Sequence, residues 1–301
     1  MQRAWRWCAE LIPISMEKIQ RSDGQRIAPM KDLPEDRIWT VESDGGIWAA
    51  KRPDWLGFPA ALFGIRQGTE MFYYALAKHN KLPMPESRIV TVGGINCWAT
   101  EYLPTRKALG TVNEPLTPAA HAKLSKTLKT DAAQREAYLR ALFLDVMLRN
   151  TDRKVANILK TDAGEAYSLY FFDHEQSLGW RGNIQAFGRN RIKSSQEEYA
   201  EIDASMPLER MYRWASSYST FSERRSVFES LDLQLSLLDE LEPQIPRVFS
   251  DNPHHVWIFP DQFKDMRSGL AAWWKYILRM PYAALDSRLF SNAVVFRSAG
   301  L

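Results

Sequence analysis

Three polar side chains at the ends of two short apolar runs have the types that phosphate chemistry requires. The runs, 158–159 and 169–172, flank a glycine turn, a pattern typical of a β-hairpin. Asp152 and Asn157 precede the first run and Asp173 follows the second, so we expect the hairpin to hold all three close together. A phosphotransferase uses an aspartate to orient the nucleophilic hydroxyl and hard oxygen ligands to hold Mg²⁺. The spacing therefore indicates a phosphotransfer site.

Each of these residues also has an ordinary structural explanation. Asp and Asn are frequent turn residues because their side chains hydrogen-bond to the nearby backbone. The rim of any hairpin therefore collects them. The combined spacing is the stronger observation, and it gains weight if a suitable lysine lies upstream.

The segment that carries these residues resembles the catalytic segment of the HipA-like kinases. It reads Asn-Thr-Asp-Arg-Lys-Val-Ala-Asn over 150–157 and Phe-Asp-His over 172–174. In that family the pattern is Asn-x-Asp-Arg-His-x-x-Asn, then a strand, then Ile-Asp-His. Lys154 stands where the family usually has histidine. The segment also resembles that of the phosphatidylinositol kinases and, more distantly, that of the protein kinases.

The resemblance implies an α+β, two-lobed protein-kinase-like fold. Its N-lobe, residues 1–104, would hold an antiparallel sheet plus one helix. Its helical C-lobe, residues 105–301, would contain the catalytic hairpin at 150–175. The hydrophobic pattern agrees, because strand-like segments fill the first part of the chain and helical periodicity follows.

A lysine in the required setting does lie upstream. Predicted strands over 37–41 and 47–51 flank a glycine turn and form a hairpin that ends in Lys51. A predicted helix over 66–79 has Glu70 near its start. In a kinase, such a helix presents a glutamate to the strand lysine, which contacts the nucleotide phosphates. The alternative is that Lys51 is solvated and that Glu70 complements the positive end of the helix dipole.

A second predicted hairpin, 87–92 and 95–103, ends where kinases have their inter-lobe hinge. The resemblance implies that backbone groups of Glu101, Tyr102 and Leu103 bind the adenine of ATP. An ordinary strand end, stopped by the proline that follows, is the alternative.

Two further segments are candidates for substrate contacts. Residues 22–25, Ser-Asp-Gly-Gln, with Lys31 nearby, are the best candidate for a phosphate-binding turn, although they contain a single glycine. Residues 181–196 are polar and basic, and in kinases the corresponding segment carries the activation loop. A solvated basic loop is the alternative for 181–196.

Helices are predicted over most of the second half of the chain. Thr117 and Pro118 mark a helix start, and the helix over 132–150 leads directly to Asp152. Within that helix, Asp145 is four residues before Arg149, the spacing of a local ion pair. Further helices are expected at 207–215, 222–231, 233–241 and 260–278, with short strands at 9–14 and 294–296.

Composition excludes several classes of protein. The 301 residues carry 39 basic and 36 acidic side chains, and a net charge of +3 gives no argument for a nucleic-acid partner. The two cysteines, Cys8 and Cys97, are too few for a disulfide framework, which suits a reducing cytoplasm. No apolar run is long enough for a transmembrane helix. We therefore expect a cytoplasmic protein without a membrane partner.

The preferred hypothesis is a kinase of HipA-like type that depends on ATP and Mg²⁺. Asp152 would act as the catalytic base, Arg153 would brace the loop or the transferred phosphoryl group, and Asn157 and Asp173 would hold Mg²⁺. Family members include bacterial toxins that phosphorylate serine or threonine of proteins. The resemblance therefore implies a protein substrate and admits a regulatory partner such as an antitoxin.

Two other hypotheses remain open. Lys154 and the weak phosphate-binding turn favour a pseudokinase or nucleotide-binding regulatory module. The likeness to phosphatidylinositol kinases favours a lipid or small-molecule kinase, although no basic amphipathic helix supports membrane docking. A purely structural protein leaves the Asp-Asn-Asp set without a reason.

Overall fold

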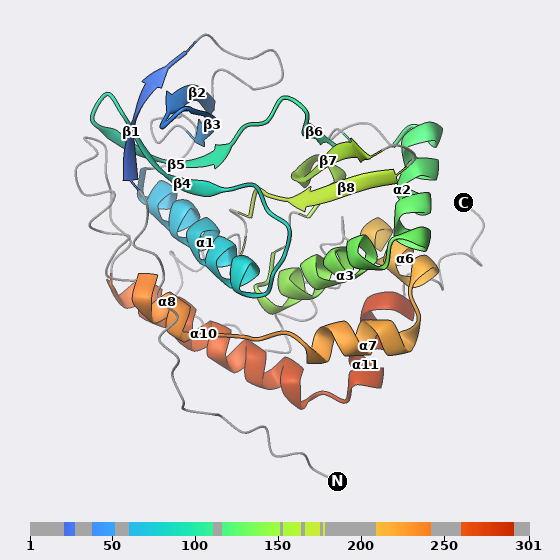
Figure 1. Ribbon diagram of the computed structural model, residues 1–301. Coiled ribbons are helices and arrows are strands. Elements are labelled where there is room, and N and C mark those ends of the chain that lie inside the picture. Colours follow the sequence, from blue (N-terminus) through green and yellow to red (C-terminus); the bar gives the residue numbers. More distant parts are fainter. Residues whose placement is uncertain are drawn as a thin grey trace.

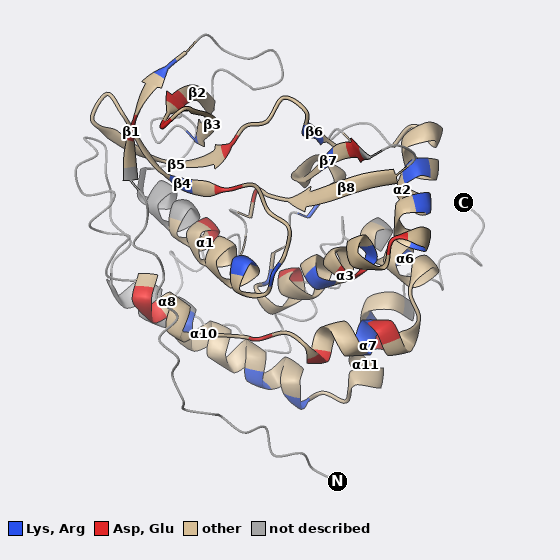
Figure 2. Cartoon of the chain, viewed as in Figure 1, with Lys and Arg blue, Asp and Glu red and all other residues tan. Residues whose placement is uncertain are grey.

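The chain has a mixed α+β fold that contains a β-barrel, a three-stranded sheet and a set of helices (Figure 1). Basic and acidic residues are spread over the barrel and the helices rather than separated into two regions (Figure 2). The computed structural model describes residues 21–27, 38–51, 60–110, 116–150, 153–163, 166–174, 177, 209–241 and 260–291.

Five strands form a closed barrel in the order β1-β2-β3-β5-β4. Because β1 pairs with β4 in parallel and the other four pairs are antiparallel, the structure differs from the antiparallel sheet expected from the sequence. Tryptophan, valine and alanine side chains, together with Cys97, fill a small core of their own. The strands are β1 (Arg21–Arg26), β2 (Ile38–Ser43), β3 (Gly46–Lys51), β4 (Ser87–Val92) and β5 (Ile95–Glu101).

Tight two-residue turns connect β2 to β3 and β4 to β5. Asp44 and Gly45 have φ angles of 49° and 72°, and Gly93 and Gly94 have φ angles of 57° and 82°. Two consecutive residues of positive φ are what a hairpin turn of this length needs, and Gly and Asp tolerate this conformation. Both hairpins predicted from the sequence are present, and they end on Lys51 and Glu101.

Helix α1 (Ala60–His79) begins six residues earlier than the sequence pattern predicts. Glu70 therefore lies in the middle of the helix, where the dipole of the helix end has little effect. The explanation of Glu70 as a charge at the helix N-terminus is wrong. Phe72 and Leu76 of α1 are completely buried in the main hydrophobic core, which also includes Trp98 of β5.

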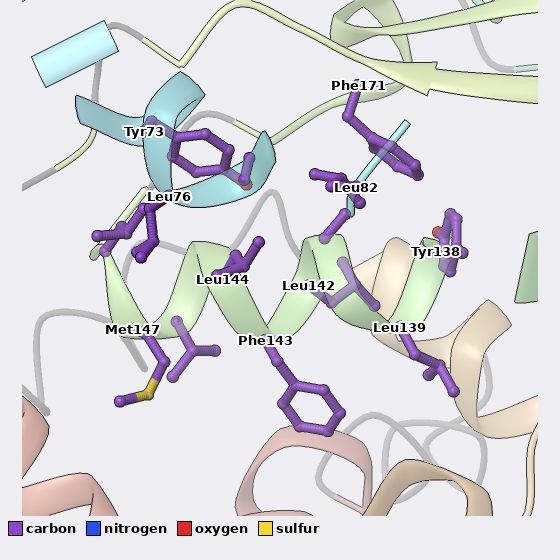
Figure 3. Packing of buried hydrophobic residues seen from close by; sticks show 14 of the residues in the cluster. Tyr73, Leu76, Leu82, Tyr138, Leu139, Leu142, Phe143, Leu144, Met147 and Phe171 are labelled. Carbon is purple, nitrogen blue, oxygen red and sulfur yellow. The ribbon is translucent and has the colours of Figure 1, made fainter. Parts of the chain in front are cut away.

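Helix α3 (Ala132–Met147) runs through the centre of the main core (Figure 3). Its last eleven residues, 137–147, include ten buried side chains, so neighbours surround it on all sides. The indole N–H groups of Trp273 and Trp274 donate to the carbonyl oxygens of Val146 and Met147 at 2.9 and 2.8 Å. These carbonyls lie in the last turn, where no regular helical partner follows, and that of Val146 also accepts from the N–H of Arg149 at 3.2 Å.

The predicted hairpin that leads to Asp173 is present and pairs with a short third strand. Its strands are β7 (Ile158–Ala163) and β8 (Ala166–Phe171), and β7 also pairs with β6 (Lys107–Ala108). The turn η1 (Val155–Asn157) precedes β7. Helix α2 (Pro118–Thr130) contacts β8, and Thr117 caps its first turn as predicted.

Most of the remaining helices lie below α1 and α3 in Figure 1, on the side away from the sheets. The first four agree to within a few residues with the helices predicted at 207–215, 222–231, 233–241 and 260–278, whereas the helical segment 282–291 was not predicted. In the described ranges, no helix is long and apolar enough to cross a membrane. The expected strands at 9–14 and 294–296 lie outside the described residues. The elements are α6 (Glu209–Tyr218), α7 (Phe221–Glu229), α8 (Ser236–Leu241), α10 (Pro260–Arg279), α11 (Tyr282–Asp286) and η2 (Ser287–Ser291).

The expected phosphate-binding turn at 22–25 is instead part of strand β1. Gly24 pairs with Val92 of β4 in the strand that closes the barrel. A Cβ atom at this position would overlap Cγ1 of Val41 and Cγ1 of Val90. The glycine is therefore needed for close packing inside the barrel.

We expect Gly24→Ala to destabilise the protein by about 1–3 kcal/mol, because the added methyl group overpacks the barrel interior. Gly269→Ala in α10 is the matched control, since nothing lies within 4 Å of its Cβ position and alanine favours a helix by about 0.5–1 kcal/mol. Urea unfolding measures both changes. If Gly24→Ala leaves the stability unchanged but weakens ATP binding, the result would support the hypothesis that residues 22–25 bind phosphate.

Candidate active site

The ammonium group of Lys51 lies between two carboxylates from distant parts of the sequence. Its Nζ atom is 2.8 Å from Oε2 of Glu70 and 2.7 Å from Oδ1 of Asp173. Glu70 is nearly buried, with a side-chain exposure of 4%, whereas Lys51 and Asp173 keep 21% and 27%. The structure thus brings together three of the site residues predicted from the sequence, one each from β3, α1 and the end of β8.

Asp173 has a backbone conformation that is uncommon for residues other than glycine. Its φ angle is 57°, in the left-handed region, which aspartate tolerates better than most residues. Burial alone would raise the pKa of its carboxyl group, but Lys51 and then Lys154 hold that pKa below its ordinary value. The carboxylate therefore remains ionised at neutral pH. Its second oxygen, Oδ2, has no hydrogen-bond partner within the described part of the chain.

Asn157 and Asp173 lie at the same end of the β7–β8 hairpin. Ile158 and Phe171 form the last residue pair of the hairpin at this end. Asn157 precedes Ile158 and Phe172 follows Phe171, so these two residues lie just beyond that pair. The carbonyl oxygen of Asn157 accepts a hydrogen bond from the backbone N–H of Phe172 at 3.3 Å. The pairing thus sets Asn157 close to the backbone that carries Asp173.

Arg153 is fully buried and fixes the ends of this hairpin. Its Nη1 group donates to the carbonyl oxygens of Asn157 and Phe172, both at 3.1 Å. Its Nε and Nη2 groups donate to Asp145 at 2.8 and 3.0 Å. Of the two roles expected for Arg153, the geometry fits bracing of the loop and not contact with a transferred phosphoryl group, because the guanidinium has no exposed surface.

Asp145 is a site residue that the sequence pattern misassigned. The sequence pairs it with Arg149, four residues later, but its carboxylate instead binds Arg153, the Asn150 side chain at 2.8 Å and the Tyr73 hydroxyl at 2.9 Å. Helix α3 ends at Met147 and Arg149 has a φ angle of 53°, so regular helical spacing no longer holds there. The sequence did contain a signal of this role, because Asp145 is an ionisable residue in the middle of an apolar helix segment.

The expected hinge contains one available backbone donor. The N–H groups of Glu101 and Tyr102 donate to the carbonyls of Glu86 and Ile47 at 2.7 and 2.8 Å, so both already serve the sheet. Among the described residues, the Leu103 N–H has no acceptor, while its carbonyl accepts from the Arg106 N–H at 2.9 Å. The N–H groups of Glu101 and Tyr102 are therefore engaged, and that of Leu103 is the one that remains a candidate for binding adenine.

Several predicted site residues lie outside the described part of the chain. Asp152, the expected catalytic base, lies outside the described residues, between Asn150 and Arg153. Lys31 and the basic segment 181–196 also lie outside them. In the described part of the chain, no group of three or more His, Cys, Asp or Glu side chains forms a metal cluster.

No protein-family model matches the sequence, and no curated protein matches it. Comparison with solved structures finds the Helicobacter pylori proinflammatory kinase CtkA, with a TM-score of 0.43 and 11% identity over 86% of this chain and 95% of that chain. It also finds HipA from the toxin–antitoxin complex of Shewanella oneidensis MR-1 with HipB and operator DNA, with a TM-score of 0.35 and 12% identity. This match covers 84% of this chain and 65% of the HipA chain.

A third neighbour is LicA in complex with AMP, with a TM-score of 0.27 and 10% identity over 83% of this chain and 91% of that chain. A HipA protein and the kinase CtkA are thus among the structural neighbours of the chain.

We expect Asp145→Asn to destabilise the protein by about 3–5 kcal/mol, because it leaves the buried charge of Arg153 without a counter-charge. Asp239→Asn is the matched control. Asp239 pairs with Arg267 at the surface, where the two side chains are 44% and 41% exposed, and we expect a loss of about 0–1 kcal/mol. Chemical unfolding measures both, and equal losses would contradict the importance of the buried pair.

Proposed function

We propose that the chain is an ATP- and Mg²⁺-dependent phosphotransferase of HipA-like type. The observation that carries the proposal is the contact of Lys51 with both Glu70 and Asp173. In the proposed two-lobed arrangement, residues 1–104 with the barrel and α1 form the N-lobe, and residues 105–301 form the C-lobe.

Lys51 is the proposed phosphate contact, and Glu70 is the group that orients it. A lysine side chain is flexible, so a fixed carboxylate beside the ammonium group lowers the cost of holding it in one position. Glu70 suits this role because its side chain is nearly buried on a long helix. Kinases place a strand lysine and a helix glutamate together for the same purpose.

Asn157 and Asp173 are the proposed Mg²⁺ ligands. Both offer hard oxygen atoms, which Mg²⁺ prefers, and it completes its coordination with water and phosphate oxygens. The residues fit a metal because Asp173 is ionised and its Oδ2 atom has no partner within the described residues. When bound, the metal would neutralise charge on the phosphates.

Asp152 is the proposed catalytic base, on the strength of the sequence pattern and of its position next to Arg153. Arg153, the next residue in the sequence, is held by Asp145 and by the carbonyl oxygen of Asn157. A base in this position would orient the hydroxyl group of the acceptor. A serine or threonine of a protein is the proposed acceptor, and this part of the proposal, like an antitoxin partner, rests on the resemblance alone.

The departure from the family at Lys154 bears on the alternative of a nucleotide-binding module without activity. Lys154 is partly exposed and lies close enough to Asp173 to help lower the pKa of its carboxyl group. The replacement of histidine thus adds positive charge beside the proposed phosphate site. This favours an active enzyme, and an experiment separates the two functions.

We expect the purified protein to release ADP from ATP and Mg²⁺ and to transfer label to protein. Asp152→Ala and Asp173→Ala should each reduce turnover by about 10²-fold or more, because one removes a proposed base and the other a proposed metal ligand. Asp162→Ala is the matched control, since this aspartate lies at the far end of the same hairpin with a side chain 71% exposed. Turnover with labelled ATP measures all four proteins.

The outcomes separate the hypotheses. No turnover, together with thermal stabilisation by ATP that Asp173→Ala abolishes, would establish a nucleotide-binding module. Turnover without label on protein, and stimulated by lipid or by small hydroxyl compounds, would establish a different acceptor. Neither turnover nor stabilisation by ATP would refute the proposal.

We expect ATP to bind at least about 10-fold more tightly than GTP, because the Leu103 N–H can donate to N1 of adenine, whereas N1 of guanine carries a hydrogen and leaves this donor unpaired. Calorimetric titration with non-hydrolysable analogues of both nucleotides, in the presence of Mg²⁺, measures the ratio. Equal affinities would remove Leu103 from the proposed adenine site.

A further inference from the structure

Tyr73 lies at the centre of a buried polar network that joins α1 to the catalytic segment. The side chain is completely buried. Its hydroxyl group donates to Oδ1 of Asp145 at 2.9 Å and accepts from Nη2 of Arg153 at 3.3 Å. A single hydroxyl group therefore connects α1 both to the central helix α3 and to the residue that braces the hairpin.

The ring of Tyr73 makes a second connection, to the residue after Asp173. It stacks on the imidazole of His174 with ring centroids 3.6 Å apart and planes within 5°. Nδ1 of His174 lies 2.6 Å from Nη2 of Arg153, and because arginine only donates, Nδ1 is the acceptor. Both the ring and the hydroxyl group of Tyr73 thus contact the machinery around Asp173.

Tyr73 and Glu70 are three residues apart on α1, the spacing of neighbours on one helix face. Glu70 contacts Lys51, Lys51 contacts Asp173, Asp173 is bonded to His174, and His174 stacks on Tyr73. These contacts close a ring around the proposed phosphate site. A movement of α1 that withdraws Glu70 must also separate Tyr73 from its partners.

We propose that Tyr73 is a positioning residue that sets the place of Glu70, and through it that of Lys51, relative to Asp173. The physical reason is the cost of breaking the network. Displacing the hydroxyl group takes one hydrogen bond each from Asp145 and Arg153, and buried charged groups lose more from a missing partner than exposed ones do. The catalytic consequence rests on the proposed function, whereas the positional consequence does not.

The competing explanation is that Tyr73 only fills space in the core. Tyr138 provides the comparison, because it is also buried, with 1% exposure, and its hydroxyl group donates to the carbonyl oxygen of Met211 at 3.2 Å. Tyr138→Phe therefore removes a buried hydroxyl group and a hydrogen bond without touching Asp145, Arg153 or His174. It is the matched control for Tyr73→Phe.

We expect Tyr73→Phe to lower kcat about 10-fold or more and to change the KM for ATP less than about threefold, because small displacements at a reacting centre act mainly on the chemical step. Tyr138→Phe should keep kcat within about twofold of wild type. The double variant Tyr73→Phe/Glu70→Gln should lose less than the product of the single effects, since both changes act on Lys51.

A second measurement does not need turnover. Acylation of Lys51 by an amine-reactive ester, followed by mass spectrometry, reports how firmly the two carboxylates hold the ammonium group. We expect the rate at Lys51 to rise about 3- to 10-fold in Tyr73→Phe and to stay at the wild-type value in Tyr138→Phe, because an ammonium group on a flexible stem that two carboxylates hold less firmly is more often open to the reagent.

The two measurements keep this inference separate from the proposed function. If the wild type has no turnover, the proposed function fails, and the acylation rates alone decide the role of Tyr73. If the wild type is active and Tyr73→Phe matches Tyr138→Phe in both measurements, the inference is refuted. If Tyr73→Phe does not fold, His174→Phe replaces it, because this variant keeps a stacked ring but removes the acceptor for Arg153, and the same kcat and acylation changes are expected.

Discussion

The rest of the site depends on one buried charge, the guanidinium of Arg153. Moving such a group out of water is costly unless a counter-charge and further acceptors meet it inside the protein. Asp145 provides the counter-charge, and the carbonyls of Asn157 and Phe172 provide acceptors. Asp145 can do so only because α3 lies deep in the core, where the tryptophans of α10 bind its last carbonyls. Helix α10 therefore supports the site through α3.

The same charge fixes the two ends of the β7–β8 hairpin. By binding one carbonyl before β7 and one after β8, Arg153 joins the backbone on both sides of the hairpin. Asp173 follows directly in a left-handed conformation, which the surrounding contacts must maintain. Its carboxylate then meets Lys51 of the barrel. The buried ion pair between Arg153 and Asp145 thus helps to determine where Asp173 meets Lys51.

What the sequence predicts correctly is mostly local. The hairpins with Asp44-Gly45 and Gly93-Gly94 follow from residues that tolerate positive φ, and the capped start of α2 follows from Thr117. The start of α1 was missed because Ala60–Ile65 has no capping residue and includes a glycine. The parallel pairing of β1 with β4 was missed because contacts between distant strands leave no local pattern. Consequently 22–25 was read as a turn.

For the site too, the sequence predicts local features but not contacts between distant segments. Lys51, Glu70 and Asp173 were selected by motif, and their proximity is a property of the fold that no local pattern contains. Asp145 was selected but given the wrong partner, because helical spacing was extended past Met147, where the helix ends. Tyr73 was not selected at all. A tyrosine on an apolar helix face is expected to pack, and only the structure shows that its hydroxyl group lies between two buried charges.

The position of Lys51 also constrains how a nucleotide would enter the proposed site. Lys51 holds Oδ1 of Asp173, so phosphates that attract the lysine compete with this carboxylate and bring negative charge towards it. Nucleotide alone would therefore weaken one contact and create a repulsion. Under the proposed function, a divalent cation held by Asp173 would supply positive charge that reduces both difficulties. Under the proposed function, metal and nucleotide should each bind more tightly in the presence of the other, with Asp173 as the residue through which they are coupled.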